Sequence, residues 1–303
     1  MKGLSMAQKN QVKKLFDREL IAKRLQKASI FQTASGPDNF IADLMINDLK
    51  DRLSTITRKF EKALLLAPHP DFFAQNIKSA EGPINFEYGL TLPSDAKGDV
   101  PFYDPARLDL PHNDYDLIVS LADLHMMDDV PGFFVQAQRY LRPDGLCVVA
   151  ALGGDSLTEL RQAWLNADVA HSGGAYARVA PFIDIRDGGA LLQRGGFALP
   201  VTDLEHHVVR YGHPIALMEE LRQFGASNPL LERPQNFVSR GLLTKVVEFY
   251  ADQFTDEDGR CRATLDLLWL MGWTPHESQQ KPLRPGSATK SLKDVLGDKS
   301  GEN

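Results

Sequence analysis

Short apolar runs separated by helix-like segments are the feature that most restricts the fold of this chain. Ala63–Ala67 is such a run, with charged residues before it and Pro68 after it. Leu117–Ser120 and Leu146–Leu152 have the same character. Continuous apolar runs of this length are typical of strands buried on both faces of a parallel sheet. Because helical patterns alternate with them, we predict an α/β fold with helices covering both faces of the sheet.

Helices are predicted where apolar residues recur every three or four positions. Asp155 or Ser156 is the expected N-cap of the helix that follows the strongest strand. A weak strand is expected at 84–88, and one or two strands between Phe197 and Arg210. The expected helices cover about 8–28, 39–54, 130–141, 156–169, 214–224, 239–253 and 263–271.

The composition restricts the class of protein further. Of the 303 residues, 43% are hydrophobic and 24% are charged, which is ordinary for a globular protein. No apolar run approaches the roughly 18 residues that a membrane-spanning helix needs. The only cysteines, Cys147 and Cys261, exclude a disulfide scaffold and a four-cysteine zinc site, and they favour a reducing compartment.

The charge is uneven along the chain. Residues 1–30 carry a local charge of +6, whereas the whole chain carries −6. The segment 1–28 is interpreted either as a helix with a solvated basic face or as an arm that contacts an acidic partner or a membrane surface. No signal peptide is visible, so we expect a bacterial cytoplasmic location, with peripheral contact to the inner membrane as an alternative. Nucleic acid is not an expected partner.

Two features around the second strong strand point to a known family. Asp104 lies twelve residues before Asp116, just ahead of that strand, and a Pro-Asp-Gly turn at 143–145 precedes the next one. In this order they resemble the class I methyltransferases that use S-adenosyl-L-methionine. A closer resemblance, over about residues 12–295, is to the methyltransferase-like assembly factors of respiratory complex I of the arginine-hydroxylase type, and more remotely to malonyl-carrier-protein methyltransferases of the biotin pathway. The segments that carry it are Leu15–Arg18, Leu124-His125, Gly153–Arg161, Leu217–Leu221, Glu257–Gly259 and Met271–Thr289.

The resemblance implies a domain organisation and a set of site residues. It implies a Rossmann-like methyltransferase sheet over 39–210, preceded by a basic amphipathic helix in 1–38 and followed by a helical segment at 211–280 and a flexible tail at 281–303. It also implies S-adenosyl-L-methionine as the cofactor, with Asp104 accepting a hydrogen bond from the adenine amino group and Glu87 as the candidate for the ribose. The full set of candidates is Ala67, His69, Glu87, Asp104, Ser120 and Leu121 for the cofactor, and His125 and Asp155 for catalysis.

One loop departs from the family pattern. After the first strand the family has a glycine-rich loop, which lets the backbone approach the cofactor closely. Here the three glycine positions hold Ala67, His69 and Asp71, and two prolines between them fix φ and remove N–H donors. This loop is therefore the feature that discriminates between two hypotheses, an active methyltransferase and a degenerate fold that has kept only partner binding.

The catalytic candidates each have a structural alternative. His125 could orient the acceptor or act as a base, because the pKa of histidine lies near neutrality, or Asp128 or Asp129 could simply hold it. Asp155 and Glu159 could face a basic acceptor such as an arginine side chain. Alternatively, Asp155 caps a helix and Glu159 is surface charge.

We expect no metal site. The loop at His69 resembles that of zinc-dependent de-N-acetylases, but it offers fewer than the three ligands that zinc catalysis needs. His112-Asn113-Asp114 has the spacing of part of an iron triad, yet it lies in a polar turn. His206 and His207 are neighbours in a strand and point to opposite faces. Trp269 and Trp273 are expected to pack in a core or an interface.

Three functions are consistent with these features. The resemblance favours a methyltransferase-like protein that acts on a protein subunit during assembly of complex I, with an iron–sulfur subunit as the candidate partner. A second hypothesis is a degenerate methyltransferase fold that serves as a partner-binding chaperone. A third is a small-molecule or carrier-protein O-methyltransferase, against which the segment 271–289 argues.

Overall fold

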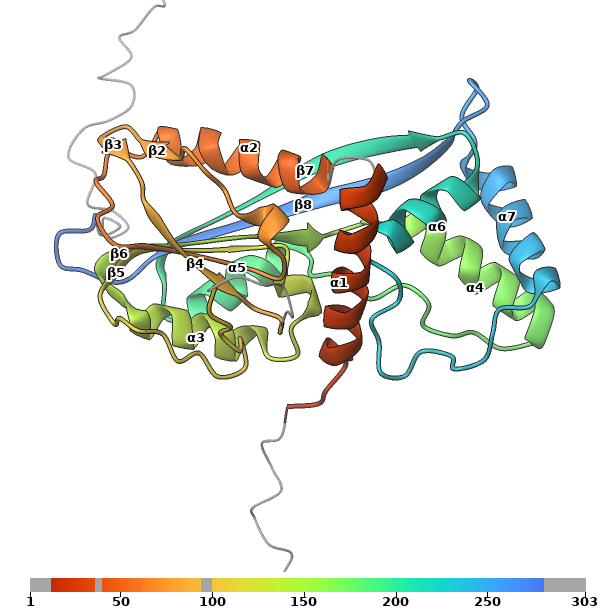
Figure 1. Cartoon of the computed structure of the whole chain (residues 1–303), viewed down its shortest axis with the longest axis horizontal. Coiled ribbons are helices and arrows are strands. Elements are labelled where there is room, and N and C mark those ends of the chain that lie inside the picture. Colours follow the sequence, from red (N-terminus) through yellow and green to blue (C-terminus); the bar gives the residue numbers. More distant parts are fainter. Residues whose placement is uncertain (1–11, 36–39, 94–99, 281–303) are drawn as a thin grey trace, which may run out of the picture.

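The computed structural model describes residues 12–35, 40–93 and 100–280. Its central sheet has six strands in the order β4-β1-β5-β6-β8-β7 (Figure 1). The first four are parallel, whereas β8 is antiparallel to both of its neighbours. The strands are β1 Ala63–Ala67, β4 Phe86–Leu90, β5 Tyr115–Leu121, β6 Leu141–Gly153, β7 Ala198–Tyr211 and β8 Cys261–Trp273, and a separate ribbon pairs β2 Lys78–Ser79 with β3 Gly82–Pro83.

A short seventh segment extends the parallel edge of the sheet. Phe102 forms a parallel bridge to Leu90, and the flanking backbone bonds join Leu90 N to Pro101 O and Tyr103 N to Leu90 O, both at 2.8 Å. The sheet thus has the α/β architecture that the apolar runs predict, including β1, β5 and β6 at the predicted positions.

Helices cover both faces of the sheet, as Figure 1 shows. On one face α2 Phe40–Ser54 packs Met45 into a core that contains Leu65 and Trp269. On the other face α3 Val130–Tyr140 and α5 Ile185–Arg194 enclose a second core around Leu66. Neighbouring residues of β1 therefore belong to opposite cores, because side chains alternate along a strand.

The long antiparallel strands β7 and β8 extend beyond the parallel part of the sheet and carry a third group of helices (Figure 1). These helices are α4 Thr158–Ser172, α6 Pro214–Gln223 and α7 Arg240–Phe254. Their shared core includes Ala163, Val246 and Tyr250. The helix α1 Arg18–Ser35 lies between this group and the parallel strands and contacts α6.

The expected helix at 263–271 is wrong, because these residues form most of β8. Ala263–Leu270 is an almost continuous buried apolar run, which periodicity alone does not separate from a buried helix. Pairing with β6 on one side and β7 on the other decides the conformation. Residues 211–280 consequently contribute two helices and one central strand, and Trp269 and Trp273 pack on the core from that strand.

Two smaller expectations are also wrong. The first helix begins at Arg18 rather than near residue 8, and Phe16 bridges Leu230 in an extended segment. The N-cap of α4 is Leu157 in the left-handed conformation, with φ of 55°, and not Asp155 or Ser156. The Ser156 hydroxyl instead donates to the carbonyls of Gly153 and Asp266. Residues 1–11 and the tail 281–303 lie outside the described residues.

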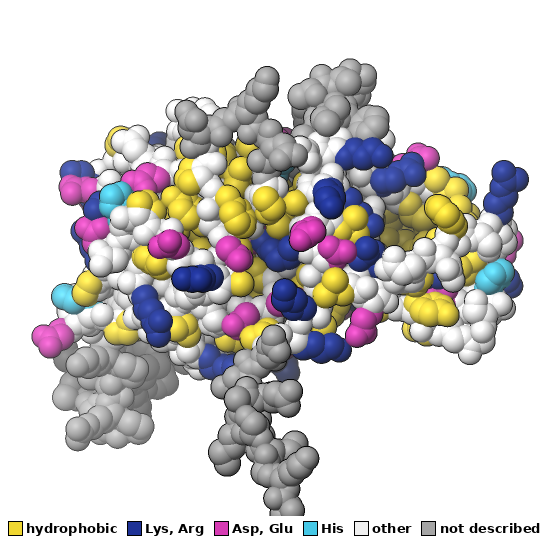
Figure 2. Space-filling view, turned by 60° about the horizontal axis from the view of Figure 1, so that its bottom comes forward, with side chains coloured by type: hydrophobic (Ala, Val, Ile, Leu, Met, Phe, Trp, Pro, Cys, Tyr) yellow, Lys and Arg dark blue, Asp and Glu magenta, His cyan; other side chains and the backbone are white. Residues whose placement is uncertain are grey.

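Within the described residues, no helix is both long and apolar enough to cross a membrane. The face that Figure 2 brings forward carries apolar side chains interspersed with acidic and basic ones.

Candidate functional site

The loop after β1 uses its own backbone donors internally. Pro68 and Pro70 have no N–H, and the Asp71 N–H donates to His69 Nδ1 at 3.3 Å. The N–H groups of Phe72 and Phe73 donate to the carbonyls of His69 and Pro70. The loop forms the 3₁₀ turn η2 Pro70–Phe72, and only the His69 N–H among residues 68–73 is left for a ligand.

Arg18 joins three segments at the carboxyl edge of the sheet. Its guanidinium group donates to both carboxylate oxygens of Asp123, at 3.1 and 3.2 Å. It also donates to the carbonyl of Thr91 at 2.7 Å and to that of Met126 at 3.0 Å. Asp123 is completely buried, so this two-pronged ion pair is shielded from water. Arg18 therefore fixes the start of α1 over the segments that follow β4 and β5.

His125 lies in the 3₁₀ turn η3 Leu124–Met126, just after β5. Its Nδ1 is buried and has no hydrogen-bond partner, and its ring centroid lies 6.0 Å from that of Phe182. Burial lowers the pKa of His125 to about 4, so the ring is neutral at pH 7. Asp128 and Asp129 do not hold it, since Asp128 accepts from the backbone of Leu15 and Phe16 and Asp129 caps α3.

Two cavities meet at His125. The smaller, of about 90 Å³, lies between α1, α2 and the loop after β1, and among its described wall residues only His69, Asp71 and His125 have charged or hydrogen-bonding side chains. We call it the apolar cavity. Its other walls are Ile21, Leu25, Ala28, Ile41, Met45, Pro68, Phe72, Ala122, Met126, Leu152, Phe224, Gly225 and Ala226.

The second cavity, which we call the charged cavity, has a volume of about 410 Å³. It lies between the extended N-terminal segment, η3 and α5, and Phe16 and Phe182 are among its apolar walls. Asp187 and Arg194 of α5 also line it, and neither makes a hydrogen bond or ion pair within the described residues. Unlike the apolar cavity, it therefore offers free charges of both signs beside apolar surface.

Some predicted site residues gather at these cavities. His69 and His125 both line the apolar cavity. Ala67, Ser120 and Leu121 are the buried ends of β1 and β5 beneath it, and the Ser120 hydroxyl has no partner. Sequence reasoning missed Arg18 as a site residue, although it had singled out the segment Leu15–Arg18, and it missed Asp187 and Arg194, which no motif marked.

Other predicted residues lie elsewhere. Asp104 is exposed, accepts from the Ala106 N–H at 3.0 Å and lines neither cavity. Glu87 occupies the second position of β4, three residues before its carboxyl end, where Tyr115 donates to it at 2.9 Å. Glu87 pairs with Leu64 of β1, which in turn pairs with Ile118 in the middle of β5. The role of Glu87 at the ribose stays a prediction.

Asp155 belongs to a separate polar cluster. It is exposed, and its N–H donates at 2.8 Å to the buried carboxylate of Asp266. The other oxygen of Asp266 lies 2.7 Å from Nδ1 of His206, which is largely exposed. The structure thus gives Asp155 a structural neighbour that the sequence did not indicate, but it does not bring Asp155 to the wall of either cavity.

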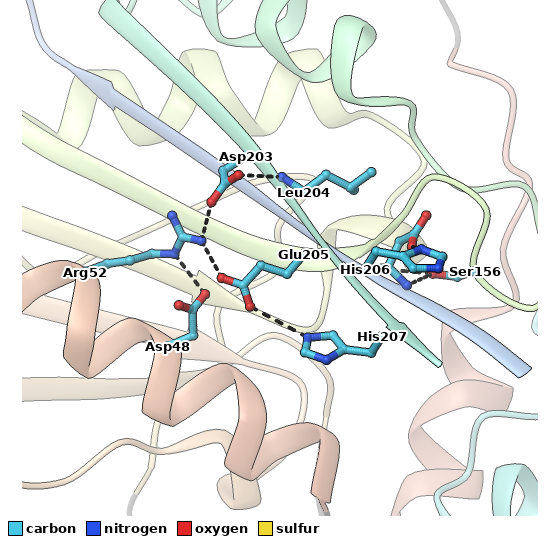
Figure 3. A network of polar contacts seen from close by, with 9 residues as sticks. Asp48, Arg52, Ser156, Asp203, Leu204, Glu205, His206 and His207 are labelled. Carbon is cyan, nitrogen blue, oxygen red and sulfur yellow. Dashed lines mark hydrogen bonds and ion pairs between the residues drawn. The ribbon is translucent and has the colours of Figure 1, made fainter. Parts of the chain in front are cut away.

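Polar contacts on β7 point to both faces of the strand, as Figure 3 shows. His207 lies 3.6 Å from Glu205, whereas His206 faces Asp266, so the two histidines point to opposite faces of β7. Arg52 of α2 donates to Asp48, Asp203 and Glu205. Burial raises the pKa of Asp48 to about 6. Among the described residues, no group of three His, Cys, Asp or Glu could hold a metal ion.

The interpretation of Glu159 as surface charge is wrong. Its carboxylate is buried and accepts from the Thr264 N–H at 2.9 Å and from the Thr264 hydroxyl at 2.6 Å. Glu159 thereby joins α4 to β8. It is not available to a basic acceptor.

The order of the strands, the antiparallel β8 and the cavities at the carboxyl edge define a class I methyltransferase fold. A methyltransferase domain family matches residues 96–149. The rat mitochondrial arginine-hydroxylase NDUFAF5 is 32% identical over 93% of this chain and 83% of its own length, and the human protein is 31% identical over 92% and 82%. The chain belongs to the NDUFAF5 family.

Other similarities are more limited. The Dictyostelium discoideum NDUFAF5 is 36% identical, but over 61% of this chain and 42% of its own length. A malonyl-[acyl-carrier protein] O-methyltransferase of Halorhodospira halophila is 34% identical over 58% and 59%. Among solved structures, the YcgJ protein of Bacillus subtilis gives a TM-score of 0.43 with 11% identity, over 78% of this chain and 99% of that protein.

The residues at the carboxyl edge do not fit the methionine end of S-adenosyl-L-methionine. That end carries an ammonium, a carboxylate and a sulfonium charge, so it needs hydrogen-bonding partners when it is taken out of water. The loop after β1 offers one free N–H, and its two polar side chains, His69 and Asp71, lie 3.1 Å apart and contact each other. Among the described residues, the rest of the apolar cavity offers only His125.

Proposed function

We propose that this chain is a maturation factor for respiratory complex I that binds an arginine-bearing segment of a protein subunit in the charged cavity. Two findings support the proposal. The relatives that align over more than nine-tenths of this chain are named arginine-hydroxylases. The free Asp187 carboxylate beside apolar walls is the observation that carries it.

The walls of the charged cavity suit an arginine side chain. A guanidinium group can donate two parallel hydrogen bonds to a carboxylate such as that of Asp187. Its aliphatic stem and flat head pack on apolar and aromatic surface, which Phe16 and Phe182 supply. Arg194 is then available to a backbone carbonyl or an acidic side chain of the same segment.

His125 gives the proposed site a neutral polar wall. A protonated imidazole would repel a guanidinium group, but the pKa of about 4 keeps His125 uncharged at pH 7. His125 thus leaves the recognition of the guanidinium group to the Asp187 carboxylate.

The proposal is a binding function rather than methyl transfer, because the loop after β1 does not suit the cofactor. The proposal corresponds to the second hypothesis from the sequence, a degenerate methyltransferase fold that serves as a partner-binding chaperone. An iron–sulfur subunit of complex I is the proposed partner, and the bacterial cytoplasm is the proposed location, where such a subunit is matured.

The test compares two peptides that differ only in the charge of one side chain. A flexible peptide with one central arginine and its citrulline counterpart are titrated into the full chain and followed by fluorescence anisotropy. We expect the arginine peptide to bind roughly tenfold more tightly, since citrulline cannot form a charged pair with Asp187.

Two variants make this test specific. Asp187→Asn removes the free charge from the cavity, and we expect it to abolish the preference for arginine. Asp184→Asn is the matched control, because Asp184 caps the same helix without lining the cavity and asparagine is also a good N-cap. Equal binding of both peptides to the unmodified chain would contradict the proposed function.

A further inference from the structure

The apolar cavity is a second binding site, separate from the site of the proposed function. We infer that it takes a neutral molecule with a compact hydrocarbon body and a single polar atom, of which phenol is the simplest example, and that the polar atom faces His125. The walls, the size and the one free polar group of the cavity carry this inference.

The walls decide that the ligand is apolar. Met45 is fully buried, and Ile21, Ala28 and Ala122 are no more than 6% exposed. Leu152 and Phe72 complete the surface that faces them. A charged or strongly polar group here would lose its hydration without gaining partners, whereas a hydrocarbon group loses nothing and fills the space.

The volume decides the size of the ligand. The enclosed space of about 90 Å³ is smaller than the apolar protein cavities of about 150 Å³ that hold benzene, so it takes at most part of a single ring, and the rest of the ligand extends past Asp71, which is exposed at the wall. The cavity's position at the ends of β1, β5 and β6 is the position where an α/β sheet binds its ligand.

His125 decides that the ligand has one polar atom. Its Nδ1 is buried without a partner, and an unsatisfied buried nitrogen is unfavourable until a ligand bonds to it. The other two polar side chains at the walls, His69 and Asp71, contact each other at 3.1 Å. A single hydroxyl group matches what remains, because it can either donate to or accept from a neutral imidazole.

This site differs from a remnant of the methyl-donor site. The donor's methionine end would need several N–H groups, and the loop after β1 has committed all but one of its own. The change from a glycine-rich loop to a proline-rich one has therefore exchanged polar surface for apolar surface.

The experiment uses benzene and phenol as probes with the full chain, labelled at its methionine methyl groups. Met45 and Met126 line the cavity, so their NMR signals report occupancy directly. We expect both probes to shift these two signals, and phenol to bind severalfold more tightly than benzene. Absence of shifts at both signals up to the solubility limit of the probes would overturn the inference.

Three variants extend the experiment. Ala28→Leu fills the cavity from α1 and should weaken the binding of both probes at least tenfold. Ala251→Leu, at an exposed position of α7, should leave the binding of both unchanged. His125→Phe should keep benzene binding and remove the advantage of phenol. Displacement of the probes by S-adenosyl-L-methionine would overturn the inference by showing a donor site. The peptide experiment is independent, because it reports on the charged cavity alone.

Discussion

The two cavities share His125 but differ in almost everything else. The apolar cavity is bounded by α1, α2 and the loop after β1, and its polar side chains, His125 apart, contact each other. The charged cavity is more than four times as large, and its Asp187 and Arg194 have no partners within the part of the chain that the structure describes. The segments Leu15–Arg18 and Leu124-His125, which carry the family resemblance, contribute to the charged cavity, whereas the loop that departs from the family lines the apolar one.

This difference teaches that the two sides of the cleft are built in different ways. The side that would hold a cofactor depends on the backbone of one loop, Ala67–Asp71. The side proposed to bind the acceptor is built from side chains of several elements, including η3 and α5. If the two sides are separate, changes to one should leave the other unaffected.

The largest effect is expected at Arg18, which fixes the start of α1 beside the two cavities. Arg18→Met leaves the completely buried Asp123 without its charged partner. We expect the free energy of unfolding in urea to fall by about 3–5 kcal/mol. Lys23→Met, at an exposed position of the same helix, is the control and should change stability by less than about 0.5 kcal/mol. Similar losses of unfolding free energy for both variants would show that the Arg18–Asp123 pair does not hold the start of α1 in place.

The next effect is the pH dependence of the free energy of unfolding that His125 contributes, since this residue lines both cavities. The folded-state pKa of His125 is about 4 and the ordinary value is 6.5, so the unfolded chain binds a proton more readily. Stability from His125 is therefore complete above pH 6.5 and falls between pH 6.5 and 4, by about 1.4 kcal/mol per pH unit and about 3 kcal/mol in all. His125→Gln should lack this component, and identical pH profiles of the two proteins would contradict the burial of His125.

A smaller effect should separate the cavities by their response to salt. Binding of the arginine peptide to the charged cavity should weaken severalfold between about 50 and 500 mM salt, because exposed charges are screened. Phenol binding to the apolar cavity should stay constant or strengthen slightly under the same conditions. Parallel salt dependence of both ligands would show that one site binds both.

The smallest effect is expected for the methyl donor itself. Calorimetric titration with S-adenosyl-L-methionine should give no binding heat up to about 1 mM, and Asp104→Ala should behave identically, because Asp104 is exposed and lines neither cavity. Micromolar binding that Asp104→Ala weakens would show that the carboxyl edge still holds the cofactor. The distinction drawn above between the apolar cavity and the charged cavity would then fail.

The central strands could be predicted from the sequence because they are buried on both faces and therefore read as unbroken apolar runs. The same property misled the interpretation of β8, since Ala263–Leu270 is equally apolar and only its pairing with β6 and β7 defines it as a strand. The position of Glu87 along its strand could not be predicted for a related reason. It depends on the strand register, which local sequence specifies weakly.

The candidate site was predictable only in part. His125 was identified by its position after β5 and by the family resemblance. Its partnerless Nδ1 depends on residues far away in the chain, as does the contact of Arg18 with Asp123, 105 positions distant. Asp187 has no motif of its own, and its role depends on the cavity that distant segments create around it.

The position of β8 has a consequence for how this protein is made. The strand lies between β6 and β7, although about fifty residues separate it from the end of β7 along the chain. While the ribosome synthesises the protein, β6 and β7 therefore emerge with open edges that face each other across a missing strand. Open edges invite pairing with other chains. These two edges are joined only after Cys261–Trp273 has left the exit tunnel and paired with both strands.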